Sequence, residues 1–362
     1  MRNKLRVRIT LRSLSSVHGF ATFATEITME TPMAGMDDVP RELLQAAYKR
    51  NPIYLLKIPL LYGLWGAATF VLYKTQASPF AIPIGIACSI FIAYLIRGLG
   101  AIAHDAVHGN CSRSKTLSYW IALLCWAPTG MSVTLYTNYH LHHHRIANTY
   151  PDVDNFVVTD YTRNPVLAKV LLLVVYTVAY PLYWLSNMPR YMKRLTPGKR
   201  VLMNVELLGF AAVMVGFFFL MPLQVFVFFY GLPFLFGSIL ASVTSMIEHY
   251  EMLPGEDAYS SRTYGTTSHL TNFLWNNVTY HNEHHKFPGI PWYNLRSFHE
   301  AAYPHYDEKV KAECHPSIYR LAFQLYGRIL KFDMPRLDER YQNVDKAAER
   351  EKYVSMAGIA AN

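Results

Sequence analysis

Residues 80–108, FAIPIGIACSIFIAYLIRGLGAIAHDAVH, join an apolar run long enough to cross a bilayer to a pair of histidines. A membrane-spanning helix needs about 20 apolar residues. Residues 80–96 supply such a run, and we expect the helix to continue beyond Arg97 towards Ala106. His104 and His108 stand four positions apart, so they lie on one face of this helix. The stretch predicts a helical membrane protein whose polar chemistry begins where a span ends.

Three further apolar runs have the length of a membrane span, namely residues 53–72, 201–220 and 225–244. Short uncharged linkers join the first span to the second and the third to the fourth, so we expect two helical hairpins. Two other apolar stretches, residues 117–136 and 166–185, contain proline, glycine or lysine, and we interpret both as helices that lie in the membrane interface or are half-inserted into the bilayer. A count with these two stretches as additional spans is the alternative.

The distribution of charge orients this arrangement in the membrane. The formal net charge is +9, and the long segment between the second and third spans is rich in lysine and arginine. By the positive-inside rule, this segment and both termini face the cytosol. We therefore predict an all-α integral membrane protein with four transmembrane helices in two hairpins, interfacial helices and a cytosolic helical cap. Nucleic-acid binding is not indicated, because no basic helix or aromatic-basic stripe is present.

The chain divides into three parts by composition. Residues 1–50 form a basic segment that we expect to be flexible, residues 51–330 the membrane domain, and residues 331–362 a polar tail. Residues 1–25 contain five basic residues and no acid, which is typical of an organelle-targeting peptide. A disordered basic tail, or a true start at Met29, Met33 or Met36, would explain the same composition. Four cysteines without a CxxC pair indicate a reducing compartment.

Histidines cluster in three short motifs, HDAVH, HLHHH and HNEHH, and one more histidine follows the fourth span. Offsets of three and four place the rings of each motif on one helical face. His142, at offset two, points away from that face and is interpreted as a neighbour. The orientation derived from charge alone places all the motifs on the cytosolic side. The candidate metal ligands and catalytic residues are His104, His108, His140, His143, His144, His249, His281, His284 and His285.

Nine imidazoles exceed the four ligands of one zinc ion and suit two ions of intermediate softness, such as iron. An iron pair with open positions can activate O₂. A metal transporter or sensor is the alternative from another functional class. Transporters place polar groups inside their spans, but these spans are almost free of titratable residues, and no HExxH motif of a zinc protease is present.

The three motifs, of the form HxxxH, HxxHH and HxxHH around two membrane hairpins, resemble those of the membrane fatty acid desaturase superfamily. This superfamily also includes acyl hydroxylases, carotenoid hydroxylases, ketolases and acyl decarboxylases. The resemblance runs from about Arg97 to His299. Residues 262–295, RTYGTTSHLTNFLWNNVTYHNEHHKFPGIPWYNL, are similar to the C-terminal core of bacterial-type acyl-lipid desaturases.

The resemblance implies that the nine histidines hold two iron ions, with His249 as the additional ligand after the last span. Acyl-CoA desaturases have an asparagine one turn before that histidine, whereas this chain has Ser245, a poorer ligand that we do not assign. Metal-bound histidines usually donate their second N–H to a carboxylate or carbonyl. The acids next to the predicted ligands, and so the candidates for this role, are Asp105, Asp152, Asp154, Glu248 and Glu283.

Other polar and aromatic residues receive weaker interpretations. His269, His299, His305 and His315 match no motif, and we expect them at the surface or behind the ligands. We expect the aromatic residues of the last motif to anchor the protein at the membrane interface rather than to line an acyl tunnel; these are Trp275, Tyr280 and Trp292.

The implied activity is O₂-dependent insertion of a double bond into a fatty acyl chain of a lipid. Hydroxylation, ketone formation or decarboxylation of an acyl or carotenoid substrate on the same scaffold is the alternative. No HPGG-type haem motif and no GxGxxG motif after a strand is present. We therefore expect a separate electron donor, a ferredoxin or a cytochrome b5, whose acidic surface would suit the basic cytosolic face.

Overall fold

The computed structural model describes residues 35–149, 152, 154–253 and 257–331, together with the short segments 10–11 and 25–26. The predicted targeting segment (residues 1–25) and polar tail (residues 331–362) lie outside these residues, apart from Thr10, Leu11, Thr25 and Lys331. The N-terminal part of the predicted flexible segment likewise lies outside them.

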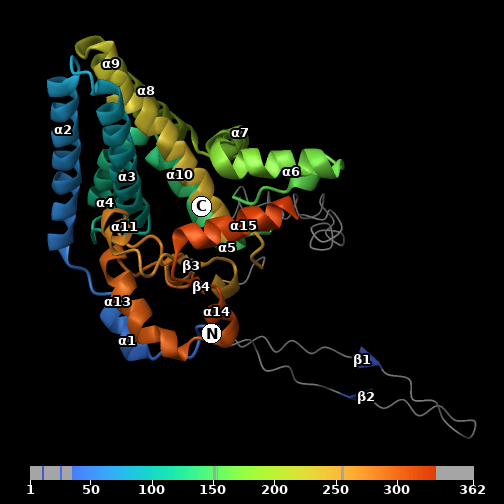
Figure 1. Ribbon diagram of the computed structural model, residues 1–362. Coiled ribbons are helices and arrows are strands. Elements are labelled where there is room, and N and C mark those ends of the chain that lie inside the picture. The colour runs from blue at the N-terminus through green and yellow to red at the C-terminus, as the bar shows by residue number, and fades with distance from the viewer. Residues whose placement is uncertain are drawn as a thin grey trace, which may run out of the picture.

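Helices make up nearly all of the regular secondary structure in the described chain, as predicted (Figure 1). The strands form two short pairs, β1 (Thr10–Leu11) with β2 (Thr25–Glu26), antiparallel, and β3 (Thr263–Tyr264) with β4 (Cys314–His315), parallel. The helices are α1 (Arg41–Ala47), α2 (Lys57–Thr75), α3 (Ala81–Val107), α4 (Lys115–Trp126), α5 (Val133–Ile146), α6 (Pro165–Val174), α7 (Tyr180–Met192), α8 (Pro197–Leu220), α9 (Leu223–Phe226), α10 (Leu232–His249), α11 (His269–Leu274), α12 (His281–Lys286), α13 (Trp292–Ala302), α14 (Glu308–Ala312) and α15 (Ile318–Leu330). Short 3-10 or π turns are η1 (Pro52–Leu56), η2 (Ala127–Thr129), η3 (Val158–Asp160), η4 (Val175–Ala179), η5 (Val227–Gly231), η6 (Asp257–Tyr259) and η7 (Tyr303–His305).

Five helices of the described chain are long and apolar enough to cross a membrane, one more than we predicted. Those that match predicted spans are Pro52–Thr75, Ala81–Val107, Pro197–Leu220 and Leu223–His249. The fifth, Pro165–Met192, comprises α6 and α7 and contains the stretch that we expected in the interface. Helix length and hydropathy by themselves therefore do not support the prediction of four membrane spans. In Figure 1, α6 and α7 run across the direction of α2 and α3, an orientation that suits a helix lying along the membrane surface.

The other ambiguous stretch, residues 117–136, is interrupted where its sequence predicts. Helix α4 ends at Trp126, and the chain turns through Pro128 and Gly130, whose φ of 66° lies in the left-handed region that favours glycine. Helix α5 then begins at Val133, and the Ser132 hydroxyl caps it by accepting a hydrogen bond from the Leu135 amide. This turn lets α5 leave the direction of α4 and carry the second histidine motif into the cap.

Helix α3 lies at the centre of the helical bundle and packs against α2, α4 and α10. Leu95, Leu99 and Ile102 in the second half of α3 are fully buried. Ile82 and Ile86, near its first turn, are exposed on the apolar surface. Helix α8 contacts chiefly α5 and α9, so the predicted second hairpin of packed spans is not confirmed. The burial of α3 is therefore concentrated at the end that carries the first histidine pair.

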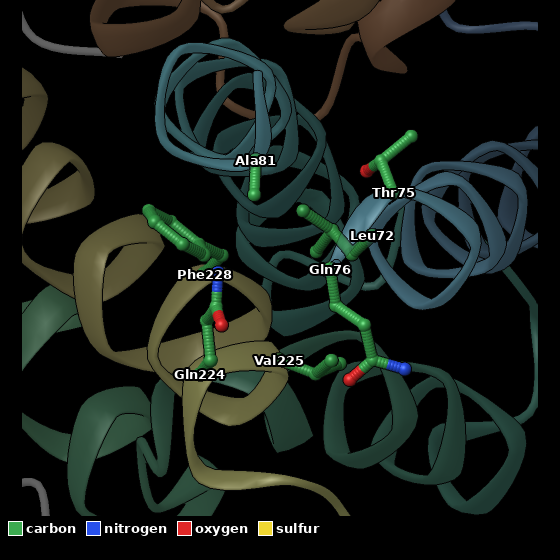
Figure 2. Close-up of a pocket in the computed structure, with 7 residues that line it drawn as sticks. All are labelled: Leu72, Thr75, Gln76, Ala81, Gln224, Val225 and Phe228. Carbon is green, nitrogen blue, oxygen red and sulfur yellow. The ribbon is translucent and has the colours of Figure 1, made fainter. Parts of the chain in front are cut away.

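At the opposite end of the bundle, the turns of α2–α3 and α8–α10 meet (Figure 2). Side chains of Leu72 and Gln76 face Val225 and Phe228 there, and they leave no space that a water molecule could enter. This contact joins α2 and the start of α3 to the turn formed by α9 and η5, far along α3 from its histidines.

A buried carboxylate in α8 connects the membrane helices to the cap. Glu206 is 5% exposed, and it accepts hydrogen bonds from the hydroxyls of Tyr119, Ser132 and Thr134. A buried carboxylate is costly unless it is hydrogen-bonded, and these three donors satisfy it. Glu206 therefore holds α8 against the first half of α4 and the beginning of α5.

Candidate metal centre

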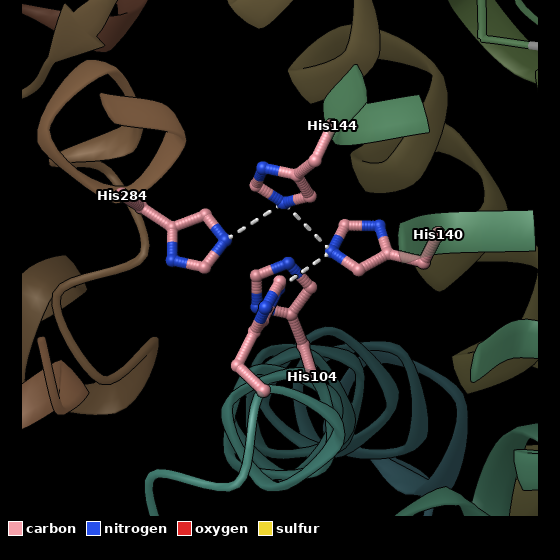
Figure 3. Close-up of side chains that lie close together, drawn as sticks. His104, His140, His144 and His284 are labelled. Carbon is pink, nitrogen blue, oxygen red and sulfur yellow. Dashed lines mark hydrogen bonds between the residues drawn. The ribbon is translucent and has the colours of Figure 1, made fainter. Parts of the chain in front are cut away.

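Five histidines from three segments of the chain gather around one point, and we call them the first histidine group. They are His104, His108, His140, His144 and His284, contributed by the end of α3, by α5 and by α12. One ring nitrogen of each lies within 4.8 Å of the corresponding nitrogen of every other. Figure 3 shows the rings of His140, His144 and His284 turned towards one another above the end of α3. The Nε2 atoms of His144 and His284 lie 3.2 Å apart, and those of His144 and His140 3.0 Å apart.

Four further histidines form the second histidine group, His143, His249, His281 and His285. Ring nitrogens of His143, His249 and His285 lie within 4.8 Å of one another, and all three residues are buried. His281 joins them because its Nε2 atom lies 3.1 Å from that of His249. The ring of His285 also stacks on that of His144 with centroids 4.4 Å apart. The two groups are therefore neighbours, and all nine predicted histidines come together.

The turn that precedes α12 brings the third motif to the first. Asn276 and Asn277 have φ angles of 56° and 53°, a left-handed conformation that asparagine tolerates better than most residues. The side-chain amide of Asn276 donates to the Gly98 carbonyl of α3 at 2.7 Å. No Cβ fits at Gly98, because it would overlap the carbonyl oxygen of Leu274. Close contact of the two backbones thus fixes α12 opposite the end of α3.

Two buried acids orient His143 in the second group. Its Nδ1 atom lies 3.0 Å from both carboxylate oxygens of Asp152 and 3.3 Å from Asp154. Burial alone would lower the pKa of His143, but the charges of Asp152 and Asp154 outweigh burial and raise this pKa to about 9. The Asp154 carboxylate also accepts hydrogen bonds from the hydroxyls of Tyr139 and Tyr180. A histidine held through Nδ1 in this way presents Nε2 to the centre of its group.

His249 and His281 have different partners. The Nδ1 atom of His249 lies 3.0 Å from the Ser260 carbonyl, which can accept its proton. Glu248 lies 3.9 Å from the Nε2 atom of His281, too far for a hydrogen bond. The Glu248 carboxylate instead pairs with Arg97 at 3.4 Å and accepts from the Tyr264 hydroxyl at 2.6 Å. This acid therefore lies beside the second group and also links α10 to α3 and β3.

The remaining two candidate acids do not hydrogen-bond to the nine histidines; they hold the surrounding segments. Asp105 accepts from the Asn110 side chain at 2.7 Å, and the same amide donates to the Pro288 carbonyl, which follows the third motif. Glu283 is fully buried and accepts from Thr263, His299 and Tyr306. Both carboxylates therefore hold the segments that surround the nine histidines rather than the rings themselves.

Several predictions for residues outside the nine need correction or sharpening. Trp275, Tyr280 and Trp292, which we expected at the membrane interface, are only 2%, 1% and 6% exposed. The prediction is wrong for them, because the cap folds over these aromatic side chains. His299 is buried beside Glu283, whereas His269 is exposed, as predicted. The other unmatched histidines are placed as follows: His305 exposed, His315 half-buried, and His142 in neither group.

Two tyrosines and an asparagine that no sequence motif indicated support the second histidine motif. Tyr139 and Tyr180 bind Asp154, and the backbone amide of Asn148 donates to Asp152 at 2.8 Å. Asn148 has a φ of 57°, which turns the chain after α5 back towards His143. An asparagine directly after the histidine helix was the available signal, since asparagine favours such left-handed turns.

The donor set fits metal ions. Burial lowers the pKa values of His140, His144, His281, His284 and His285 well below the usual value, so their rings are neutral and carry free lone pairs. The Nε2 atom of His285 is buried and has no hydrogen-bond partner within the described chain. Two nitrogens bound to one ion at about 2.1 Å would lie roughly 3–4 Å apart, which matches the separations of 2.9 to 3.2 Å between Nε2 atoms. The buried clusters are consistent with a metal site.

Comparison with known proteins identifies the family. The sequence profile of the fatty acid desaturase family matches residues 80–316, well over half of the chain. The chain is 28% identical over 217 residues to a sphingolipid delta(4)-desaturase of Pongo abelii (58% of this chain, 62% of that protein). It is 30% identical over 237 residues to a sphingolipid delta(4)-desaturase/C4-monooxygenase of Mus musculus (60% and 67%). It is 26% identical over 272 residues to an sn-1 acyl-lipid omega-3 desaturase (ferredoxin) of Synechocystis (65% and 73%).

The match to the first of these relatives spans less than two thirds of its length. The profile match nevertheless includes all three histidine motifs and the helices that present them. This chain belongs to the fatty acid desaturase family, a family of oxidoreductases.

Proposed function

We propose that this protein is a membrane desaturase that holds two iron ions on its nine clustered histidines and uses O₂ to insert a double bond into a fatty acyl chain. The observation that carries the proposal is the pair of adjacent, largely buried histidine groups, supplied by helices α3, α5, α10 and α12. When bound, iron would supply the oxidising chemistry that an unactivated C–H bond requires.

The residues of the chain would position and protect that chemistry. The first group would hold one ion through five histidines and the second group the other through four. Asp152 and the Ser260 carbonyl would fix the rings of His143 and His249 by accepting their Nδ1 protons. The surrounding core, with Trp275 and Tyr264 fully buried, would exclude water from the reacting centre.

Hydroxylation is a second candidate activity on the same scaffold. One relative is named as both a desaturase and a C4-monooxygenase, and it matches this chain at 30% identity. Removal of a second hydrogen gives a double bond, whereas addition of oxygen at the first carbon gives an alcohol. Small differences in substrate position choose between these outcomes.

The electrons would come from a separate donor protein that docks on the side of the histidines. We propose that this side is cytosolic and that both termini also lie in the cytosol. The Synechocystis relative is named with ferredoxin, which supports a ferredoxin or a cytochrome b5 as the donor class. Exposed basic side chains on α5 and at the helices α7 and α8 that contact it would attract an acidic donor; they include Arg145, Lys193 and Lys199.

Lipid profiling tests the proposed activity. The full chain would be expressed in a host that supplies a ferredoxin or cytochrome b5 system, and total lipids would be compared by mass spectrometry with those of the empty host. We expect new acyl chains that are lighter by two hydrogens. New acyl chains that are heavier by one oxygen would show that the activity is hydroxylation and not desaturation. Unchanged lipids together with transport of metal ions would contradict both activities and support a transporter.

The raised pKa of His143 predicts how metal binding depends on pH. Below pH 9, the metal-free protein holds a proton on His143, since its pKa is about 9, and metal must displace this proton. Burial keeps the rings of the neighbouring ligands neutral, so the proton on His143 dominates the pH dependence; these ligands are His140, His144, His281, His284 and His285. Apparent Fe²⁺ affinity, measured anaerobically by titration, should therefore rise by up to about tenfold per pH unit from 6.5 towards 8.5.

The matched control for this dependence is Asp152→Asn, which removes a charge that raises the pKa of His143. The variant should show a shallower rise with pH and weaker binding at pH 8.5, because the ring is less well oriented. Equal slopes in the two proteins would contradict the assigned role of Asp152.

A further inference from the structure

A cavity of about 800 Å³ opens beside the first histidine motif, where the helices α2 and α4 begin. Its size is typical of sites for small molecules, which range over roughly 300–1,000 Å³. Cys111, three residues after His108, forms part of its wall. The cavity therefore lies on the same side of the bundle as the two histidine groups.

Three cationic side chains line this cavity: Lys49, Arg50 and Arg113. All three residues are exposed, and no acidic side chain lines the cavity with them. Within the described part of the chain, none of the three forms an ion pair or a side-chain hydrogen bond. Arginine matches the geometry of phosphate oxygens, and lysine adds a point charge. The cluster is thus suited to a phosphate group.

Another part of the cavity wall is apolar. Leu55 and Leu117 line it next to the first turns of α2 and α4, both of which continue as apolar helices. A ligand in this position would place its charged end among the cations and direct an attached hydrocarbon chain towards the bundle. This division into a basic and an apolar part matches an amphiphile better than a fully soluble anion.

The basic wall is attached directly to the scaffold of the metal centre. The side-chain amide of Asn294, in α13, donates to the backbone carbonyls of Ala47 and Lys49 at 2.8 and 2.9 Å. Tyr54 stacks on Tyr293 of the same helix with ring centroids 4.1 Å apart. Helix α13 follows the third histidine motif closely, so a ligand held by this wall keeps a fixed distance from the histidines.

We propose that this cavity binds the phosphate-bearing headgroup of the acyl substrate, through Arg50, Arg113 and Lys49. That the ligand is the substrate rests on the proposed function. The binding site itself follows from the cavity and its charges. Phosphate is present in phospholipid headgroups and in coenzyme A thioesters, and both would use the same cations. A neutral lipid of the same chain length would lack this contact.

Binding to the purified, iron-loaded full chain tests the inference, in detergent and without an electron donor, so that no product forms. The probes are stearoyl-lysophosphatidate, stearoyl-coenzyme A and the neutral monostearoylglycerol. The double variant R50Q/R113Q should bind a phosphate-bearing probe about tenfold more weakly than the wild type, because hydrogen bonds to charged groups are among the stronger ones. Binding of monostearoylglycerol should stay within about twofold of the wild type. The phosphate probe that loses affinity identifies the source of the headgroup.

Two control variants separate loss of charge from damage to the fold. Lys115→Gln removes a nearby exposed cation that does not line the cavity, and it should bind every probe as the wild type does. R50K/R113K retains both charges and should recover most of the lost affinity. The inference is overturned if R50Q/R113Q binds both phosphate probes as tightly as the wild type does, or if its affinity for the neutral lipid falls by the same factor. Selective loss of phosphate-probe binding, together with unchanged lipids in the lipid-profiling experiment, would support the binding site and contradict the proposed function.

Discussion

Replacement of His144 by alanine is expected to abolish lipid turnover and to remove roughly half of the bound iron. His144 belongs to the first histidine group, where its Nε2 atom lies 3.0 Å from that of His140 and 3.2 Å from that of His284. Its removal would leave one ion with an incomplete set of ligands. Chemistry that depends on a pair of ions would then stop, although the second group is unchanged. Iron per chain, measured by mass spectrometry, and double-bond formation are the two readouts.

His142→Ala is the matched control, because His142 lies on the same helix two residues away and belongs to neither group. It should keep the iron content and most of the activity of the wild type. Full iron content in His144→Ala, or equal losses in the two variants, would contradict the assignment of His144 as a ligand. His284→Ala should behave like His144→Ala, since both rings belong to the first group.

Replacement of Gly98 by alanine is expected to destabilise the protein by about 3 kcal/mol or more, at the upper end of the cost of overpacking. A methyl group at this position would overlap the backbone carbonyl of Leu274, and backbone cannot move aside as a flexible side chain can. The same displacement would break the hydrogen bond from Asn276 to the Gly98 carbonyl. Helix α12 would then shift away from α3, so iron content should fall together with thermal stability.

Gly100→Ala provides the control on the same helix. A Cβ at Gly100 would lie 3.8 Å from the Trp126 ring nitrogen, an ordinary van der Waals distance. This variant should unfold at the wild-type temperature or slightly above it, because alanine favours helix over glycine. Thermal unfolding of the detergent-solubilised proteins measures both effects. Equal unfolding temperatures for the two variants would show that the contact between α3 and α11 is looser than described.

The sequence alone determined where the histidines lie along the chain and that they share helical faces. Hydropathy located the four apolar runs, because a span is a local property of about 20 consecutive residues. A spacing of four positions placed His104 with His108 and His281 with His285, because this offset completes about one helical turn. The sequence also predicted the break in residues 117–136, where proline and glycine interrupt the helix.

The sequence did not determine which histidines share a group. His143 and His144 are adjacent, yet they belong to different groups, and so do His284 and His285. Successive residues of an α-helix point about 100° apart, so each pair of adjacent histidines directs one ring into each group. That division becomes visible only when α5 and α12 face one another across the end of α3.

Only the tertiary structure decided the partners of the candidate acids, the burial of the aromatic residues and the position of the cationic cavity. Asp152 reaches His143 because the left-handed Asn148 turns the chain back, whereas Asp105 and Glu283 point into the scaffold. Lys49 and Arg113 stand far apart in the sequence but line one cavity. The physical reason is that hydropathy and helical periodicity act over a few residues, while these contacts depend on how distant segments pack.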